Sequence, residues 1–205
     1  MFILRIMRGV RRVREMIYSR KRFLVYSTDL KITAESSCTA AVPIEFRVDA
    51  PETIAILRTR GAEYGIDAPM AAQIDRQLTE SEVCVSGWVG GELAYYGWIQ
   101  FKQRRLARRT TLRLPTGTAF IYRCFTRADF RGNHIYPAAL NYTCRWLAEQ
   151  GYQWALIDHQ VGNSASQAGI LRIGMQPFAK YTVVRMIWFR WAVPDEALYR
   201  LTSHA

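Results

Sequence analysis

Apolar and polar residues recur with strand or helix spacing along most of the chain from residue 44 onward. Alternation predicts strands that are buried on one side, and a 3.6-residue period predicts amphipathic helices. The predicted elements are, in order, a strand at 44–48, helices at 51–60 and 69–78, a β-hairpin at 83–101, strands at 119–126 and 154–158 with a helix at 137–150 between them, a helix at 164–173, a long strand or bent strand pair at 181–193, and a helical turn at 195–201.

Two of these strands read as central ones. Residues 119–126 are almost continuously apolar, as are residues 154–157, and such runs are typical of strands covered on both faces. The helix between them has Pro137 in its first turn and Gly151 just beyond its end, which are the usual start and stop signals. We therefore expect a strand–helix–strand unit at the centre of the fold.

The first 43 residues carry a different pattern. Residues 4–22 place Leu4, Met7, Val10, Val13 and Ile17 at helical spacing with arginines between them, so they predict a basic amphipathic helix. A short strand-like run follows at 23–26, and residues 32–43 are small and polar, as in a linker. The sequence thus divides into an N-terminal extension and linker (1–43) and a main domain (44–205).

The formal net charge of +11 is concentrated in two places. Residues 1–31 hold nine Lys or Arg and two acidic residues, and a second basic run begins at Lys102 within residues 102–117, which are predicted to form a mobile loop. This balance favours an anionic small molecule, an anionic membrane surface or nucleic acid as partner. For residues 1–22 three interpretations stay open: docking on the main domain, attachment to an anionic surface or acidic partner protein, and nucleic-acid binding.

The four cysteines form no C-x-x-C pair, and Cys84 and Cys124 lie in apolar, strand-like surroundings. They are interpreted as reduced thiols of a cytoplasmic protein, with peripheral attachment to the inner face of the membrane as an open alternative. No apolar run reaches the roughly 18 residues that would span a bilayer. No His, Cys and acidic residues have metal-ligand spacing, so no metal is expected.

The first motif that carries chemistry is Arg131-Gly132-Asn133-His134-Ile135-Tyr136, between a strand and a helix. A strand that leads into a helix presents unpaired backbone N–H groups at the positive end of the helix dipole. This arrangement binds phosphate or pyrophosphate. The alternative is an ordinary strand-to-helix turn.

The second motif is Asn163-x-x-Ser166, which opens a helix that closes at Gly174-Met175. On its own it is typical of a capped helix with a glycine stop and needs no ligand. Its position after the second central strand places it beside the first motif.

The element order and these two motifs resemble the GNAT superfamily of acyl-CoA-dependent N-acetyltransferases over about 150 residues. The resemblance implies an α/β (α+β) fold: a mixed, mostly antiparallel sheet with helices on both faces and two central strands splayed around an acyl-CoA cleft. The family loop reads Arg/Gln-x-x-Gly-x-Gly/Ala. Here His134 and Tyr136 stand where glycine, or glycine and alanine, are usual, and Met175 replaces a usual Phe.

The resemblance further implies acyl transfer from acetyl-CoA or another acyl-CoA to an amine, by direct attack in a ternary complex. Phe125 and Thr126 would offer backbone groups to the pantetheine arm, residues 131–136 would hold the pyrophosphate, and Asn163 and Ser166 would lie beside the CoA. A backbone N–H near Thr126 would polarise the thioester. The acceptor is a small-molecule or polymeric amine, and the basic runs favour an anionic one.

Catalytic residues are less clearly marked. The family often has a tyrosine seven residues after the Asn as general acid, and Ile170 occupies that position here. Tyr181 and Tyr136 are substitutes for it. Asp158 and His159 end the second central strand and are candidates for the general base, since histidine side chains titrate near neutral pH.

Each assignment has an alternative. His159 is also explained by a hydrogen-bond network at a strand end, and Cys124 by a small core residue rather than a nucleophile. The missing glycines and tyrosine fit a non-catalytic CoA-binding sensor or scaffold. Charge alone supports a nucleic-acid-binding protein, although aromatic residues are not interleaved with the first basic run.

Overall fold

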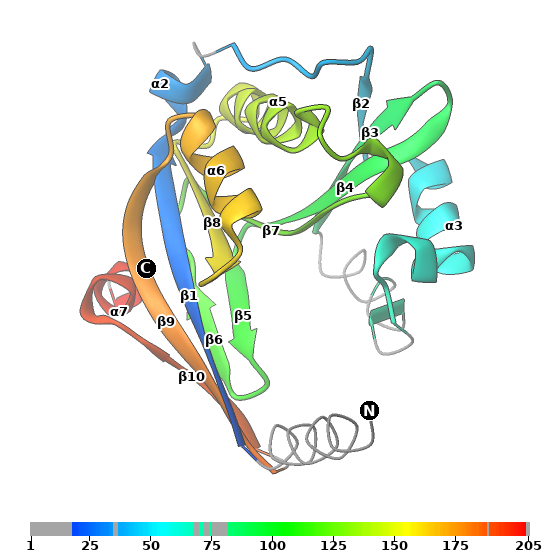
Figure 1. Cartoon of the computed structure of the whole chain (residues 1–205). Coiled ribbons are helices and arrows are strands. Elements are labelled where there is room, and N and C mark those ends of the chain that lie inside the picture. Colours follow the sequence, from blue (N-terminus) through cyan, green and yellow to red (C-terminus); the bar gives the residue numbers. More distant parts are fainter. Residues whose placement is uncertain are drawn as a thin grey trace, which may run out of the picture.

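A computed structural model describes residues 18–34, 37–67, 70–71, 74, 82–187 and 189–203 of the chain (Figure 1). In chain order the elements are β1 (Tyr18–Asp29), α2 (Leu30–Ala34), β2 (Glu45–Val48), α3 (Pro51–Thr59), η1 (Gly61–Tyr64), β3 (Val83–Val89), β4 (Glu92–Gln100), β5 (Gln103–Ala107), β6 (Thr110–Arg113), β7 (Thr118–Thr126), η2 (Ala128–Phe130), α5 (Ile135–Glu149), β8 (Trp154–Gln160), α6 (Ser164–Arg172), β9 (Gln176–Met186), β10 (Phe189–Pro194) and α7 (Glu196–Ser203).

Eight strands form one sheet in the order β10-β9-β1-β8-β7-β4-β3-β2, and β5 and β6 pair separately. Every neighbouring pair in the large sheet is antiparallel except β7 and β8, which are parallel. A parallel pair needs a crossover, and α5 supplies it. The prediction of a mixed, mostly antiparallel sheet is confirmed.

The parallel pair separates part-way along its length. Residues 118–121 of β7 pair with residues 154–157 of β8. Beyond this point β7 continues to Thr126 and β8 to Gln160 without pairing to each other. Arg123 has φ of 50° there, and the register between β4 and β7 shifts at the same place. A residue in this conformation bends the strand, so the carboxyl ends of β7 and β8 diverge as predicted.

Helices cover both faces of the sheet. On one face α2, α5 and α6 bury Leu30, Leu140 and Ile170 against Ile121 and Ile157. The other face is covered by α3, α7 and the β5–β6 hairpin. Their buried residues Leu57, Leu198 and Leu112 join a second cluster with Phe120 and Leu156. Alternate residues of the central strands therefore anchor two separate cores, as the period of 2 requires.

The sheet begins earlier in the chain than the sequence pattern indicates. The helix predicted for residues 4–22 is wrong from Tyr18 onward, because Tyr18–Asp29 form one continuous strand between β8 and β9. Val25 and Tyr26 of this strand are fully buried. Part of the predicted N-terminal extension (1–43) therefore belongs to the main sheet, because β1 pairs with β8 and β9.

The basic segment predicted as a mobile loop is also ordered differently. Residues 103–107 and 110–113 form the β5–β6 hairpin. Its apolar side buries Leu106 and Leu112, and the arginines between them face outward or line a cavity described below.

Two predictions lie largely or wholly outside the described residues. The basic stripe over residues 4–17 is one of them, so its docking, membrane and nucleic-acid interpretations stay predictions. The helix at 69–78 is the other, apart from helical residues at 70, 71 and 74. In the part of the chain that is described, no helix has the length and apolar character needed to cross a bilayer.

Candidate functional site

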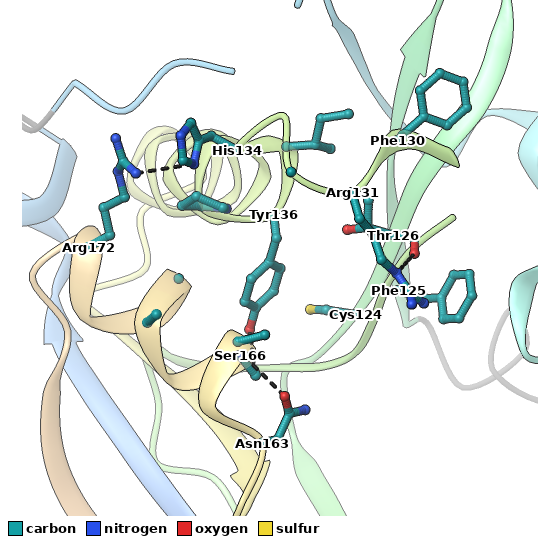
Figure 2. Close-up of a pocket in the computed structure, with 16 residues that line it drawn as sticks. Cys124, Phe125, Thr126, Phe130, Arg131, His134, Tyr136, Asn163, Ser166 and Arg172 are labelled. Atoms are coloured by element: carbon teal, nitrogen blue, oxygen red, sulfur yellow. Dashed lines mark hydrogen bonds between the residues drawn. The ribbon is translucent and has the colours of Figure 1, made fainter. Parts of the chain in front are cut away.

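A cavity of about 670 Å³ lies between the first turn of α5, the end of β7 and the start of α6 (Figure 2). We call it the α5 cavity. It brings together nine of the ten residues predicted to bind the cofactor: Phe125, Thr126, Arg131, Gly132, His134, Ile135, Tyr136, Asn163 and Ser166.

The loop before α5 and the first turn of this helix line the cavity. Gly132 has φ of 85° and His134, the residue before the helix, has φ of 56°. Pro137 lacks an N–H, and the first N–H groups of any helix have no intrahelical acceptor. The donors of Ile135 and Tyr136 therefore remain for a ligand at the positive end of the helix dipole. Glycine is not needed at position 134, because histidine adopts the same left-handed conformation here.

Two positive side chains line the same cavity. Arg172, in the last turn of α6, donates to Nδ1 of His134 at 3.1 Å across the mouth of the cavity (Figure 2). Arg131 turns back along β7, where its Nε donates to the carbonyl oxygen of Thr126 at 3.1 Å. The remaining guanidinium N–H groups of both arginines are suited to phosphate oxygens.

The start of α6 forms the opposite wall. Asn163 caps this helix, since its side-chain oxygen accepts from the backbone N–H of Ser166 at 3.1 Å. The hydroxyl of Ser166 in turn shares a hydrogen bond of 3.1 Å with that of Tyr136. The second sequence motif thus closes the cavity at the side away from Arg172, as Figure 2 shows.

Tyr136 occupies space that a small residue would leave open. Its ring lies directly over Gly169 of α6, where an added Cβ would come within 2.5 Å of the tyrosine Cδ1. Burial, the largest cause, raises the pKa of Tyr136, so its hydroxyl stays protonated at neutral pH. The pair of Tyr136 and Gly169 lets α5 and α6 pack closely despite the bulky side chain.

This contact predicts that the effect of Gly169→Ala on stability changes sign when Tyr136 is removed. Alanine in place of Gly169 should destabilise the protein by about 1–3 kcal/mol, because the methyl group overlaps the Tyr136 ring. In a Tyr136→Ala background the same change should instead stabilise by up to about 1 kcal/mol, since alanine is the better helix former. Urea denaturation of the four proteins in this cycle measures both values. Equal effects of Gly169→Ala in the two backgrounds would contradict the assigned contact.

Cys124 forms part of the cavity wall beside the point where β7 bends. Burial raises the pKa of its thiol to about 12. A thiol that stays protonated is a poor nucleophile, which favours the interpretation of Cys124 as a structural residue.

Asn133 and Ile170, both singled out by the sequence, lie outside the cavity lining. Asn133 serves the loop itself: its side chain donates to the carbonyl of Phe130 and its carbonyl accepts from the N–H of Ala41. Ile170 is fully buried in the core under α6. The position where the GNAT family often has a tyrosine therefore faces the core.

Asp158 and Tyr181 meet on the other side of the splayed strands. The Tyr181 hydroxyl donates to Oδ2 of Asp158 at 2.5 Å, and Arg104 lies 3.4 Å from the same oxygen. Burial first, and then the charge of Asp158, raise the pKa of Tyr181. The carboxylate also adds, after burial, to the raised pKa values of Cys124 and Tyr136, so its field reaches the α5 cavity.

His159 points to the face of β8 opposite to that of Asp158, and it does not line the α5 cavity. It is 5% exposed, its Nδ1 lies 2.9 Å from the carbonyl oxygen of Gln160, and its Nε2 lies 3.4 Å from the Tyr26 hydroxyl. This geometry matches the strand-end hydrogen-bond network. Within the described ranges no three His, Cys, Asp or Glu side chains are grouped as metal ligands.

Sequence reasoning did not assign a site role to several lining residues. Arg172 is the basic residue in the last turn of the helix that the second motif opens, and that position is a signal that the sequence offers. Phe130, Ala165, Ala168 and Gly169 carry no signal in the sequence, because their role depends on how α5 and α6 meet.

The arrangement of the strands is shared with solved structures. An acetyltransferase of the GNAT family from Colwellia psychrerythraea superposes with a TM-score of 0.57 at 16% identity, covering 82% of this chain and 56% of that one. The chain has the GNAT fold. A GCN5-related N-acetyltransferase from Sphaerobacter thermophilus gives a TM-score of 0.53 at 14% identity, with 87% and 56% covered. The chain thus spans little more than half the length of these two GNAT proteins.

A third structure with the GNAT fold is a smaller enzyme. The aminoglycoside N-acetyltransferase AAC(6')-Iy in complex with CoA gives a TM-score of 0.51 at 13% identity, and 69% of this chain covers 91% of that one. No protein-family model matches the sequence, and no curated protein matches it. At these identities the likeness establishes the fold and leaves activity to be argued from the residues.

Proposed function

We propose that the protein is an acyl-CoA-dependent N-acyltransferase that moves an acetyl or other acyl group to an amine. One observation carries the proposal: the N-terminal end of α5, the bend of β7 and the first turn of α6 line a single cavity beside the gap between β7 and β8. A pyrophosphate at the helix and a thioester in the gap would be held by one continuous surface.

The residues present fit CoA. The mouth of the α5 cavity offers N–H groups of the α5 first turn, together with Arg131 and Arg172, for phosphate oxygens. Its inner wall is apolar at Cys124 and Phe125, which suits the pantetheine arm. The solved AAC(6')-Iy complex contains CoA in the same fold, which supports this assignment.

The reaction needs a path for two protons. The amine nitrogen attacks the thioester carbonyl, the C–S bond breaks, and CoA leaves as a thiolate that takes up a proton. The attacking amine, an ammonium ion in water, must lose a proton before the attack and another as the amide forms. Holding amine and thioester together in the gap supplies much of the acceleration.

Asp158 is the best placed group to accept the amine proton. It stands where β7 and β8 separate, and Tyr181 and Arg104 fix its carboxylate. The Tyr181 hydroxyl, kept protonated, holds that carboxylate in place and offers a donor close to the reaction. His159 lies on the opposite face of β8 and takes no part.

Turnover measured as free-thiol release tests this function. Acetyl-CoA and longer acyl-CoAs are offered with a panel of amines. We expect Asp158→Asn to lower kcat at least about a hundredfold, because it keeps the shape and removes the base. The affinity for CoA, from calorimetry, should stay unchanged.

His159→Gln is the matched control on the next residue of β8. It should leave kcat within a few fold and its pH dependence unchanged. Loss of turnover in this variant, with Asp158→Asn active, would reassign the base. Tight CoA binding without transfer to any amine would instead favour a non-catalytic CoA-binding sensor, which Ile170 and Tyr136 also fit.

A further inference from the structure

A second cavity, of about 620 Å³, lies on the side of the sheet opposite α5, and six arginines line it. We call it the arginine cavity. Its cationic residues are Arg104, Arg105, Arg108, Arg123, Arg185 and Arg190. They come from the β5–β6 hairpin, from β7 and from the β9–β10 hairpin, so the fold collects them from three distant parts of the sequence.

Four of these six charges have no acidic partner among the described residues. Among the described residues, Arg104 is the arginine of this lining that forms an ion pair, and its partner is Asp158. No described carboxylate lies within ion-pair distance of Arg105, Arg108, Arg185 or Arg190. Moreover, Arg185 and Arg190 are directly opposite each other on β9 and β10. Like charges in such a cross-strand pair destabilise a sheet, and an anion between them reverses that effect.

Hydrogen bonds and aromatic contacts hold the walls of the arginine cavity in place. Thr110 fixes the β5–β6 hairpin to β10, because its hydroxyl accepts from the N–H of Ala192 at 2.9 Å and donates to the carbonyl of the same residue at 3.3 Å. Arg109 also lies over the ring of Phe189, 4.8 Å from its centre. The inner wall is aromatic, with Phe23 stacked on Tyr181 at 4.8 Å.

Neighbouring residues at the bend of β7 line the two cavities. Arg123 lines the arginine cavity and Cys124 lines the α5 cavity, at the bend of β7. Tyr181 lines the arginine cavity and donates to Asp158. A ligand in the arginine cavity therefore lies next to the proposed base.

We infer that the arginine cavity binds the acyl acceptor and selects a small amine that carries phosphate or carboxylate groups. The inference rests on the proposed function. Guanidinium groups bind such anions through paired hydrogen bonds, and the volume is that of a small-molecule site. The amine of the acceptor lies toward Asp158, and its anionic end lies between Arg185 and Arg190.

Calorimetry on the full chain, saturated with CoA to occupy the α5 cavity, tests the inference. The probes are O-phosphoserine, serine and inorganic pyrophosphate. O-phosphoserine should bind at least about tenfold more tightly than serine, because the two differ only in the phosphate. The double variant Arg185→Gln with Arg190→Gln should lose that preference and bind pyrophosphate at least about tenfold more weakly.

The matched control is the double variant Arg113→Gln with Arg145→Gln, which removes the same charge from exposed sites outside the cavity lining. It should keep the anion affinities within about twofold, and all three proteins should bind CoA equally. Equal weakening in the two double variants would show a general effect of net charge and overturn the inference. So would failure of both anionic probes to bind.

The last probe in the binding experiment is a single-stranded RNA oligonucleotide. RNA that binds more tightly than either small anion and depends on Arg185 and Arg190 would overturn the inference in favour of nucleic acid. The two proposals fail separately. Turnover of neutral amines without anion selectivity would support the acyltransferase function and contradict the anionic acceptor. Anion binding without turnover would contradict the acyltransferase function and support an anion-binding site.

Discussion

Valine in place of Gly132 is expected to weaken CoA binding at least about tenfold, equivalent to about 1.4 kcal/mol. Gly132 has φ of 85° and lines the α5 cavity. A β-branched residue is strained in that conformation and places methyl groups where a phosphate would approach the backbone. Calorimetry with CoA measures the affinity, and thermal unfolding measures the cost to stability.

The chain offers a closely matched control. Gly151, just after α5, has φ of 84°, and like Gly132 it has no atom within 4 Å of an added Cβ. Gly151→Val should therefore lower the melting temperature to a similar extent as Gly132→Val while leaving CoA affinity intact. Similar losses of affinity in the two variants would place the effect in general destabilisation and remove the loop from the CoA site.

Much of this loop could be predicted because its signals are local. An apolar run followed by Arg131-Gly132 and a helix places the loop at the end of a central strand, and a helix start needs only short-range information. The same holds for the cap at Asn163, whose partner is three residues away. Local patterns therefore predicted most of the residues that line the α5 cavity.

Features that depend on distant contacts were not predictable. The basic residues Arg20, Lys21 and Arg22 obscure the alternation of β1, and its place between β8 and β9 depends on partners at least about 125 residues away. The β5–β6 hairpin has the same problem, since its arginines are typical of a solvated loop. Only the packing of its Leu106 and Leu112 against the sheet makes it a structured element.

The pairing of Tyr136 with Gly169 shows the limit most directly. The sequence places a tyrosine where the GNAT family usually has glycine or alanine. It could not show that a glycine on the next helix accommodates the ring, because that contact depends on how α5 packs against α6. The arginine cavity is likewise assembled from hairpins about 80 residues apart.

Alkaline pH is expected to unfold this protein well before its arginines lose their charge. Burial raises the pKa of Cys124 and of Cys144 to about 12 each, and raises that of Cys84 as well. In the unfolded chain thiols titrate near 8.5. Above that pH the unfolded state releases protons that the folded state keeps, so the free energy of unfolding falls as pH rises.

The effect should be large. Well above pH 8.5 each of these thiols contributes about 1.4 kcal/mol per pH unit, so the three together approach about 4 kcal/mol per unit. Above about pH 10 the buried hydroxyls of Tyr95, Tyr136 and Tyr181, whose pKa values burial also raises, add to the slope. The total stability of a typical domain, about 5–15 kcal/mol, would be consumed within a few pH units.

Urea denaturation under reducing conditions between pH 7.5 and 10 measures this slope. Cys144→Ala should reduce it by about one third, because one of the three thiols no longer titrates. Val85→Ala, at a residue 1% exposed beside Cys84, should lower stability equally at every pH and leave the slope unchanged. A free energy of unfolding that stays constant from pH 8 to 9.5, or a slope insensitive to Cys144→Ala, would contradict the buried thiols as its cause.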